Sequence, residues 1–585
     1  MLQSESTHYS LLIESTMSEQ ELKLHVPQQS RAKVQKALEK AEKISLRAMY
    51  FDTSDRQLAK AKVAIRLRQE GDKWVQTLKM AGSHSLSRIE LNHHRPGPLL
   101  DLSLYAGTEA EPILTQLSKP LELRYETDVI RLFKTQSTHL GKVEIAYDTG
   151  IIRAGRLELP LYEVEFELKS GDICAMFQLG QRWLKQYNLI LDMRTKSHRG
   201  DSLANMMARI NATEPEHQLK VESQETSRFW AERKARPYAL NKNLTATQAL
   251  CRLTDECIEQ ISSNAAYLAE VDTAGVLSVA RPGHVHQLRI GIRRLLSNWK
   301  LFKGLAHLPS EELQTQIRAF LARFGSTRDT DVMINSIMPS LHRAGMPVLE
   351  VDHYSGKSAS DIAREVAFQS LLVQLLEWLA TVPQADPSKE AKDKENTARK
   401  TEAPSITASS AEINKVDTVL SQQVETTQEN LSTHTDIVLS TSLGIAEIIP
   451  LVPSTPSIFN LRKALEKRLS KWNKGIISHW RYHDKNDIEA YHDLRKRIKK
   501  MRYGLNVYEG LEGHADLSLY IKRLAQAQEV FGILNDHASA LAYFEKITDK
   551  TPQAWFAVGY LTAQLKRLMR EADKALKRLP KRISF

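Results

Sequence analysis

Two carboxylates and an ammonium group alternate near the start of the chain, at Glu19, Glu21 and Lys23 in SEQELKLHV. Alternate side chains of a β-strand share one face, so Leu22 and Leu24 would occupy the other. Carboxylate oxygens suit hard cations such as Mg²⁺, and a lysine suits phosphate as a compact charge. The segment predicts a strand able to hold a metal and a phosphate together, although for so few residues an amphipathic edge strand is the simpler interpretation.

The same alternation of charged and apolar residues recurs as far as about Leu191. It is present in VAIRLRQ, WVQTLKM, SRIELN, KVEIAYD and YEVEFELKSG. The polar positions are Arg66, Arg68, Thr77, Lys79, Arg88, Glu90, Glu144, Asp148, Glu163, Glu165 and Glu167. A solvent-facing surface explains one or two such strands. Several strands that carry both signs of charge on one face favour a closed sheet with a charged interior.

From about Met17 to Asn205 these motifs resemble the CYTH domain of the triphosphate tunnel metalloenzymes. The matching segments, in order, are EQELK, YFDT, AIRLR, WVQTLK, RIEL, IAYDTG, the E-x-E-x-E strand and TKSHRG. The resemblance implies an eight-stranded antiparallel β tunnel that encloses a triphosphate. It also implies basic residues on the phosphates and carboxylates on Mg²⁺ or Mn²⁺.

The site residues implied by this resemblance form two sets. The catalytic, phosphate-binding set is Lys23, Arg66, Arg68, Lys79, Arg88, Arg131 and Lys196. The metal-binding set is Glu19, Glu21, Asp148, Glu163, Glu165 and Glu167. These carboxylates would repel a triphosphate unless cations intervened, so a two-metal transfer of a phosphoryl group to water is expected. No P-loop pattern G-x-x-x-x-G-K-[ST] competes for this role.

Helical periodicity replaces strand alternation from about Thr245, and this half contains an internal repeat. One copy, VHQLRIGIRRLLSNWKLF, begins at Val285, and the other, YHDLRKRIKKMRYGLNVY, begins at Tyr491. At helical spacing each copy has a single apolar stripe opposite a face with His and basic residues. The matched apolar positions are Leu288, Ile292, Leu295, Trp299 and Phe302 in the first copy, and Leu494, Ile498, Met501, Leu505 and Tyr508 in the second.

This half resembles the CHAD domain, an all-α domain of two related helical bundles that is often fused after CYTH. The resemblance implies a basic pocket for inorganic polyphosphate. Its expected residues are His286, Arg289, Arg293, Arg294, His492, Arg495, Lys496, Lys499 and Arg502. The first copy has Leu296 where the second has Arg502, so the first copy is expected to hold phosphate less well.

The predicted fold class is α+β with two domains. The expected ranges are an N-terminal extension at 1–16, the CYTH tunnel domain at 17–205, a linker at 206–244, the first CHAD repeat at 245–380, an insertion at 381–457 and the second CHAD repeat at 458–585. The insertion contains no Phe, Trp or Tyr, so it is expected to be disordered. Every expected catalytic residue precedes residue 210, so the first 210 residues are expected to be active alone.

Charge and composition restrict the partners and the compartment. Residues 455–585 contain 26 Lys and Arg against 14 Asp and Glu, a net +12 within a total of +11. A basic third on a neutral remainder implies a polyanionic partner. Three cysteines give no disulfide framework, which is typical of a reduced, cytoplasmic protein. The sequence shows neither a membrane span nor a signal peptide.

The sequence therefore predicts a cytoplasmic inorganic triphosphatase that depends on Mg²⁺ or Mn²⁺ and carries a polyphosphate-binding domain. One alternative is hydrolysis of an organic triphosphate, such as thiamine triphosphate or a nucleotide. A non-catalytic polyphosphate-binding adaptor is an alternative of another class, and the complete acidic set stands against it. A nucleic acid partner is disfavoured, because Trp480 beside the basic residues fits a helix core as well as a stacking platform.

Overall fold

The computed structural model describes residues 17–81, 86–241, 243–273, 282–349, 356–383, 461–511 and 517–585. All of these belong to one compact unit, formed by Met1–Pro387 and Leu461–Phe585. The expected extension at 1–16 and all but the first three residues of the expected insertion at 381–457 lie outside the described residues.

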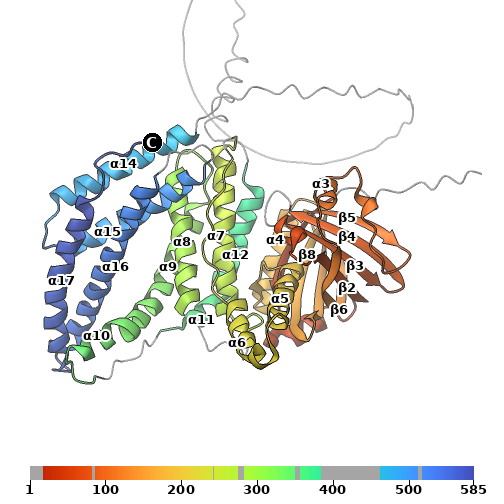
Figure 1. Cartoon of the computed structure of the whole chain (residues 1–585), viewed down its shortest axis with the longest axis horizontal. Helices are drawn as coiled ribbons and strands as arrows, with labels where there is room; N and C mark the ends of the chain where they lie inside the picture. The colour runs from red at the N-terminus through yellow and green to blue at the C-terminus, as the bar shows by residue number, and fades with distance from the viewer. Residues whose placement is uncertain are drawn as a thin grey trace, which may run out of the picture. The chain divides into compact units, whose positions relative to one another are not determined.

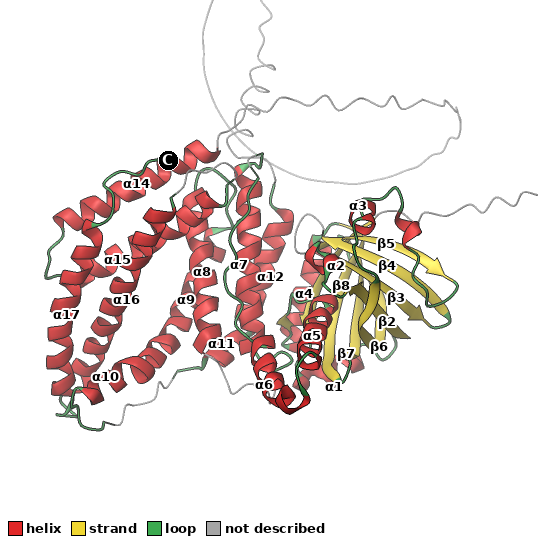
Figure 2. Cartoon of the chain, in the orientation of Figure 1, coloured by secondary structure: helices red, strands yellow, loops and turns green. Residues whose placement is uncertain are grey.

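The N-terminal part is built on nine strands (Figures 1 and 2). They are β1 (Met17–His25), β2 (Glu42–Thr53), β3 (Val63–Glu70), β4 (Lys73–Ala81), β5 (Ser87–Arg95), β6 (Leu121–Ser137), β7 (Gly141–Ala154), β8 (Leu157–Gly171) and β9 (Ile190–Leu191). The order β5-β4-β3-β2-β6-β7-β8-β1 closes through a β5–β1 pairing, and β9 pairs with β1. All pairings are antiparallel, so the predicted eight-stranded antiparallel tunnel is confirmed.

Six helices accompany the barrel. They are α1 (Arg31–Ala37), α2 (Gln57–Lys60), α3 (Glu111–Thr115), α4 (Cys174–Tyr187), α5 (Lys196–Asn211) and α6 (Gln218–Phe229). The range expected as a linker, 206–244, thus begins inside α5 and contains α6. Short 3₁₀ helices lie at Gln28–Ser30, Leu102–Tyr105 and Pro215–His217.

Where helix α4 covers it, the barrel wall is buried on both faces, which explains the alternation in the sequence of β8. On β8, Val164 and Phe166 are fully buried on the outer face, where α4 packs against the strand. The Phe166 ring meets the Trp183 ring of α4 edge-on, with centroids 5.9 Å apart. The intervening Glu165 belongs to the opposite face, which lines the interior of the barrel. Apolar side chains therefore fasten the outer helices while charged ones fill the interior.

The C-terminal part is helical (Figure 2). Its first bundle contains α7 (Ala246–Leu268), α8 (Pro282–Phe302), α9 (Glu311–Val332), α10 (Met338–Arg343), α11 (Ala359–Arg364) and α12 (Val366–Thr381), with a π-helical turn at Met333–Ile337. Its second bundle contains α14 (Leu461–Tyr482), α15 (Ile488–Glu509), α16 (Ser518–Ile547) and α17 (Ala554–Lys577). The repeated helices, α8 and α15, pack against each other.

The predicted apolar stripes of these two helices are confirmed. All ten matched positions are at most 1% exposed. Burying two equivalent stripes leaves the basic faces of α8 and α15 outside the cores of their own bundles. The internal repeat therefore specifies a paired arrangement of basic helices.

Helix α5 approaches the barrel closely because residue 200 is a glycine. A Cβ atom at Gly200 would lie 2.2 Å from Cδ2 of Tyr125 on β6. The Tyr125 ring is itself stacked on Tyr50 of β2, with centroids 4.6 Å apart, so it has little freedom to move. The side chain of Thr195 caps the start of α5 by accepting the His198 N–H at 3.0 Å. The cap and the glycine together place Lys196 at the barrel.

We expect Gly200→Ala to destabilise the protein by about 1–3 kcal/mol, because the added methyl group overpacks a rigid aromatic pair. Thermal unfolding of the full chain measures this as a lower midpoint. The matched control is Gly559→Ala in α17, where a Cβ would meet nothing within 4 Å. That control should gain about 0.5–1 kcal/mol from helix propensity. Equal effects of the two substitutions would show that the contact with Tyr125 does not restrict α5.

Candidate functional site

A cavity of about 1280 Å³ extends from the interior of the barrel to residues 231–240 and helix α7, and it is lined mostly by charged side chains. The predicted residues that line it are Glu19, Glu21, Lys23, Arg66, Arg68, Lys79, Arg88, Arg131, Asp148, Glu165, Glu167 and Lys196. Glu163 does not line the cavity, but it contacts Lys196, which does. The structure thus brings both tunnel sets together around one space.

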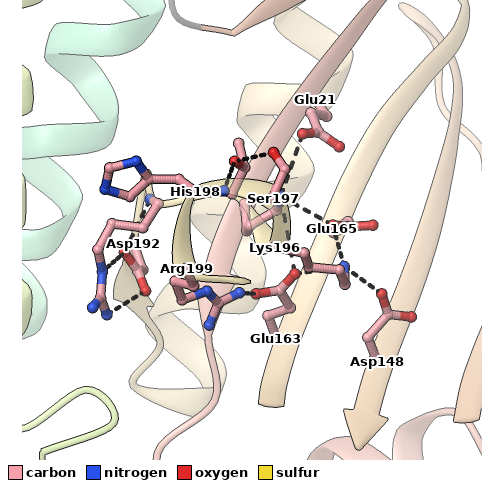
Figure 3. Close-up of polar contacts among 12 residues, drawn as sticks. Glu21, Asp148, Glu163, Glu165, Asp192, Lys196, Ser197, His198 and Arg199 are labelled. Atoms are coloured by element: carbon pink, nitrogen blue, oxygen red, sulfur yellow. Dashed lines mark hydrogen bonds and ion pairs between the residues drawn. The ribbon is translucent and has the colours of Figure 1, made fainter. Parts of the chain in front are cut away.

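Three carboxylates form an acidic cluster, Asp148, Glu163 and Glu165, with one oxygen of each within 4.8 Å of the others. Strand register explains the cluster, because Asp148 of β7 lies opposite Glu163 of β8. The Lys196 ammonium group contacts all three carboxylates, at 2.6, 2.6 and 2.8 Å respectively (Figure 3). Arg131 binds both oxygens of Asp148 at 2.7 Å.

Two carboxylates of the acidic cluster, Glu165 and Asp148, are held in their ionised form. Burial alone would raise the pKa of Glu165, but Lys196, Lys23 and Arg131 outweigh burial and hold that pKa well below its usual range. Burial is likewise outweighed at Asp148, whose pKa is lowered by Lys196 and Arg131. Ionised carboxylates at this spacing offer oxygen ligands to a hard cation.

A second acidic pair lies on the neighbouring strands β1 and β5. Lys79 contacts Glu19 at 2.7 Å and Glu90 at 2.8 Å. Burial raises the pKa of Glu19 to about 8, against the attraction of Lys79. The pKa of Glu90 is lowered, because Lys79, a hydrogen bond with Glu19 and Arg66 outweigh the effect of burial. The pair therefore retains one proton near neutral pH. Glu90 was not among the expected site residues, although its strand parity was visible in the sequence.

Three predicted arginines also line the cavity. Arg66 donates to the Tyr50 hydroxyl at 3.3 Å and lies 3.6 Å from Glu90. Burial and the neighbouring Arg66 lower the pKa of Arg68, which pairs with Glu70. Arg88 lies opposite Glu19 in the strand register and donates to the Ser87 carbonyl at 2.9 Å. Over the whole lining, lysine and arginine side chains outnumber aspartate and glutamate side chains, so the cavity favours an anion.

The remaining tunnel residues pair along the strands. Lys23 contacts Glu21 at 3.4 Å and Glu165 at 3.1 Å. Glu167 pairs with Lys169 at 2.8 Å, and burial raises the pKa of Glu167. Lys169 also lines the cavity and continues the parity of the E-x-E-x-E strand, so the sequence carried a signal for it that the expected set did not use.

In the helical part, four of the predicted cations converge where α8 packs against α15. Arg289 and Arg293 of α8 and Arg495 of α15 all act electrostatically on Lys499. Burial, followed by these three arginines, lowers the pKa of Lys499 to about 6, while Asp536 of α16 opposes the shift. This cluster of like charges is stabilised by any anion placed among them.

Within this cluster, Arg289 donates to the Phe324 carbonyl at 2.6 Å. Among the other predicted residues of the helical part, His492 is hydrogen-bonded to Asn535 of α16 at 2.6 Å. His286 is exposed on α8, and Arg502 is half-buried on α15.

The structure does not bring Arg294 and Lys496 to the cluster. Arg294 is buried and donates to Gln260 Oε1 at 2.6 Å and to the Arg236 carbonyl at 3.2 Å. Lys496 is exposed and pairs with Asp493 at 3.2 Å. Each is adjacent in sequence to a residue of the cluster, but consecutive helical residues point in different directions.

Comparison with known proteins gives two family matches. Residues 17–200 match the model of the CYTH domain, and residues 265–545 match the model of the CHAD domain. An inorganic triphosphatase from Haemophilus influenzae is 31% identical over 159 residues, which are 26% of this chain and 44% of the relative. The matched region thus spans less than half the length of that relative.

Two solved structures are similar at low scores. The CHAD domain from the plant Ricinus communis is 21% identical with a TM-score of 0.37, and the match covers 60% of this chain and 99% of that one. An adenylyl cyclase-type protein from Hippeastrum, described as having a dominant triphosphatase activity, is 17% identical with a TM-score of 0.23. That match covers 30% of this chain and 90% of the other. Among the described helices, none combines the length and apolar character that crossing a bilayer requires.

We expect Lys499→Met to stabilise the protein, most strongly near pH 6. An unfolded lysine keeps its proton up to about pH 10, whereas folded Lys499 loses it near pH 6. The unfolded state therefore binds more protons in between, so this lysine's destabilising effect fades as the pH rises through that window. Thermal midpoints across the window measure the gain, with exposed Lys474→Met as control. A gain that does not change with pH would contradict the assignment.

Proposed function

Because the chain carries a CYTH domain followed by a CHAD domain, we propose that it hydrolyses inorganic triphosphate in the tunnel with a divalent cation and binds inorganic polyphosphate on its helical part. The observation that carries the proposal is the acidic cluster and an excess of cations around one cavity. A bare phosphoanhydride with a bound divalent cation has this charge pattern.

The donor set of the acidic cluster fits Mg²⁺ or Mn²⁺. All three donors are carboxylates, which hard cations prefer, and all three are buried, which orders them before a cation binds. Asp148 and Glu165 would offer their oxygens from the cavity side, with Glu163 behind them. A bound divalent cation supplies positive charge to phosphate oxygens and acidifies a bound water.

The basic residues of the tunnel would bind and orient the substrate. Arg66, Arg68 and Arg88 present guanidinium groups, which bind phosphate oxygens in pairs of hydrogen bonds. Lys196 and Lys23 neutralise the acidic cluster in the ligand-free protein. When a cation takes over that task, both ammonium groups become available to phosphate. The wall of the barrel limits the access of water, so each of these contacts acts in a reduced dielectric.

An organic triphosphate remains the alternative substrate, and it would require a surface for its ring. Tyr50 and Tyr125 line the cavity, but they stack on each other and Gly200 packs against Tyr125. These two rings are therefore better explained as packing than as a platform for a base. This supports the inorganic substrate over a nucleotide or thiamine triphosphate.

The helical part would bind polyphosphate at the cluster of Arg289, Arg293, Arg495 and Lys499. The low pKa of Lys499 supports this proposal, because a polyanion would restore the proton that burial and the neighbouring arginines remove. Salt should weaken binding steeply, since each neutralised phosphate releases counterions.

We expect Glu165→Gln to lower the rate of tripolyphosphate hydrolysis by at least about 100-fold, since removing a direct ligand costs no less than removing an outer partner. Phosphate release from tripolyphosphate, ATP and thiamine triphosphate, with and without Mg²⁺, measures the effect and the substrate preference together.

The control for this measurement is Glu158→Gln, at an exposed position of the same strand that pairs with Arg153. It should retain wild-type turnover. Normal turnover in Glu165→Gln at saturating Mg²⁺ would contradict the proposed site. A higher kcat/KM for ATP than for tripolyphosphate would favour the nucleotide alternative.

We expect Arg495→Ala with Lys499→Ala to weaken polyphosphate binding by about 1 kcal/mol more than Arg289→Ala with Arg293→Ala, because the first copy lacks a counterpart of Arg502. Filter-binding titrations of the full chain at two salt concentrations measure both losses.

The control for these titrations is Lys496→Ala, which removes a basic residue from the same helix but outside the cluster. It should change affinity little. Equal losses in the two double variants would remove the asymmetry, and equally tight binding of DNA at matched charge would favour a nucleic acid partner.

A further inference from the structure

We propose that Asp272, contributed by the helical part of the chain, is a positioning residue for the acidic cluster of the tunnel and acts through Arg199 on Glu163. The inference rests on the proposed function, in which that cluster holds the divalent cation. It extends that function to a residue within the range matched by the CHAD domain, 265–545, and outside the range matched by the CYTH domain.

A continuous chain of ion pairs joins Asp272 to the cluster. Oδ2 of Asp272 lies 3.5 Å from Nη1 of Arg199 and 3.2 Å from Nη2 of Arg194. The other terminal nitrogen of Arg199 pairs with Oε2 of Glu163 (Figure 3). The second oxygen of Glu163 lies 2.6 Å from the Lys196 ammonium group. Arg199 and Lys196 thus fix one oxygen each, and Glu163 cannot rotate without losing one of them.

Burial makes this chain of ion pairs sensitive to the loss of one member. Arg199 and Asp272 side chains are 2% and 1% exposed, and Arg194 is 6% exposed. Arg194 has a second acidic partner, Asp192, at 2.8 Å. Breaking a buried pair on one side leaves an uncompensated charge, which is strongly unfavourable. Without Asp272, Glu163 would be the one carboxylate still paired with Arg199 among the described residues, with Asp192 acting on it less strongly.

Removing Asp272 should therefore weaken cation binding as well as the fold. A guanidinium group that has lost one of two carboxylates attracts the remaining one more strongly. Glu163 would then be drawn toward Arg199 and away from the oxygens of Asp148 and Glu165. Outer partners of metal ligands typically change metal affinity by about 10- to 100-fold when they are removed.

The backbone of the helical part places Asp272 for this contact. Asp272 and Glu270 both have left-handed conformations, with φ of 59° and 67°, in the turn that follows α7. Such conformations are costly for most residues and persist where the surroundings impose them. Val271 between them is fully buried, and its N–H donates to the Ala266 carbonyl of α7 at 2.9 Å. Glu270 pairs with Arg364 of α11. The turn is therefore anchored on the helical part while Asp272 reaches the arginines of the tunnel.

The sequence predicts that the first 210 residues are active alone, but a fragment of that length would lose the contact between Asp272 and Arg199. Such a fragment would contain every predicted catalytic residue and both arginines, but not Asp272. Arg194 and Arg199 would then lack one of their buried partners.

The test compares Asp272→Asn with the wild-type full chain. The first readout is Mn²⁺ binding by titration calorimetry, with the metal alone, and the second is the Mg²⁺ dependence of tripolyphosphate hydrolysis. We expect the dissociation constant for Mn²⁺ to rise about 10- to 100-fold. We expect kcat at saturating Mg²⁺ to change less than the Mg²⁺ concentration that gives half of it. Glu311→Gln, an exposed carboxylate of α9 in the same helical part, is the control and should keep wild-type affinity.

A merely structural role is distinguished by a double-mutant cycle. Arg199→Lys keeps the charge but loses the fork that spans two carboxylates, so it should also weaken Mn²⁺ binding. Adding Asp272→Asn to Arg199→Lys should then cost no further metal affinity, because both substitutions interrupt the same path. Additive losses, or a lower thermal midpoint with unchanged metal affinity, would overturn the proposal. If Asp272→Asn does not fold, unchanged Mn²⁺ affinity in Arg199→Lys overturns it instead.

The wild-type chain distinguishes failure of the proposed triphosphatase function from failure of the role proposed for Asp272. A wild-type chain that binds Mn²⁺ through Glu165 but does not hydrolyse tripolyphosphate would end the triphosphatase assignment and leave the role of Asp272 to the calorimetric comparison. A wild-type chain with no cation site that Glu165→Gln removes would overturn both proposals.

Discussion

The compensation of buried charge is the constraint on which the rest of the tunnel depends. An unpaired ion inside a protein is so unfavourable that it changes its protonation state instead of staying charged. The barrel meets this constraint by aligning carboxylates and cations on adjacent strands, as Asp148 does with Arg131 and Glu90 with Lys79. Strand register decides these partners, and therefore the pairing of strands and the pairing of charges must be correct together.

This constraint also explains how a charged cavity can accept a charged ligand. In the ligand-free protein the acidic cluster is neutralised from within, by Lys196 above all. On the proposed function, a divalent cation and a phosphate chain replace internal pairs by external ones, so charge stays compensated throughout. The pair formed by Glu19 and Glu90 adds a proton that a cation could displace.

The helical part gathers like charges at one place. Burial and three arginines act on Lys499, Asp536 opposes them, and the pKa of this lysine falls to about 6. On the proposed function, this cluster gains stability from a polyanion, whereas the tunnel would bind a cation as well. The two parts of the chain would thus recognise the same phosphoanhydride chemistry by different means.

The sequence by itself determined the barrel, its charged interior and the paired basic helices. Alternation has a period of two and helical stripes a period near 3.6, so both are visible along the chain, and the residues that follow them, such as Glu165 and Arg293, were found in this way. The same alternation contained Glu90 and Lys169, which only the cavity identified as part of its lining.

Tertiary structure decided which charges meet. Arg294 follows the basic pattern of its helix, yet it is satisfied by Gln260 and Arg236 on another side. Asp272 belongs to no periodic pattern, since it lies in a turn, and its contact with Arg199 joins residues far apart in the chain. Local periodicity specifies the face on which a side chain lies, but a partner across the fold is set by packing and by the cost of leaving buried charge unpaired.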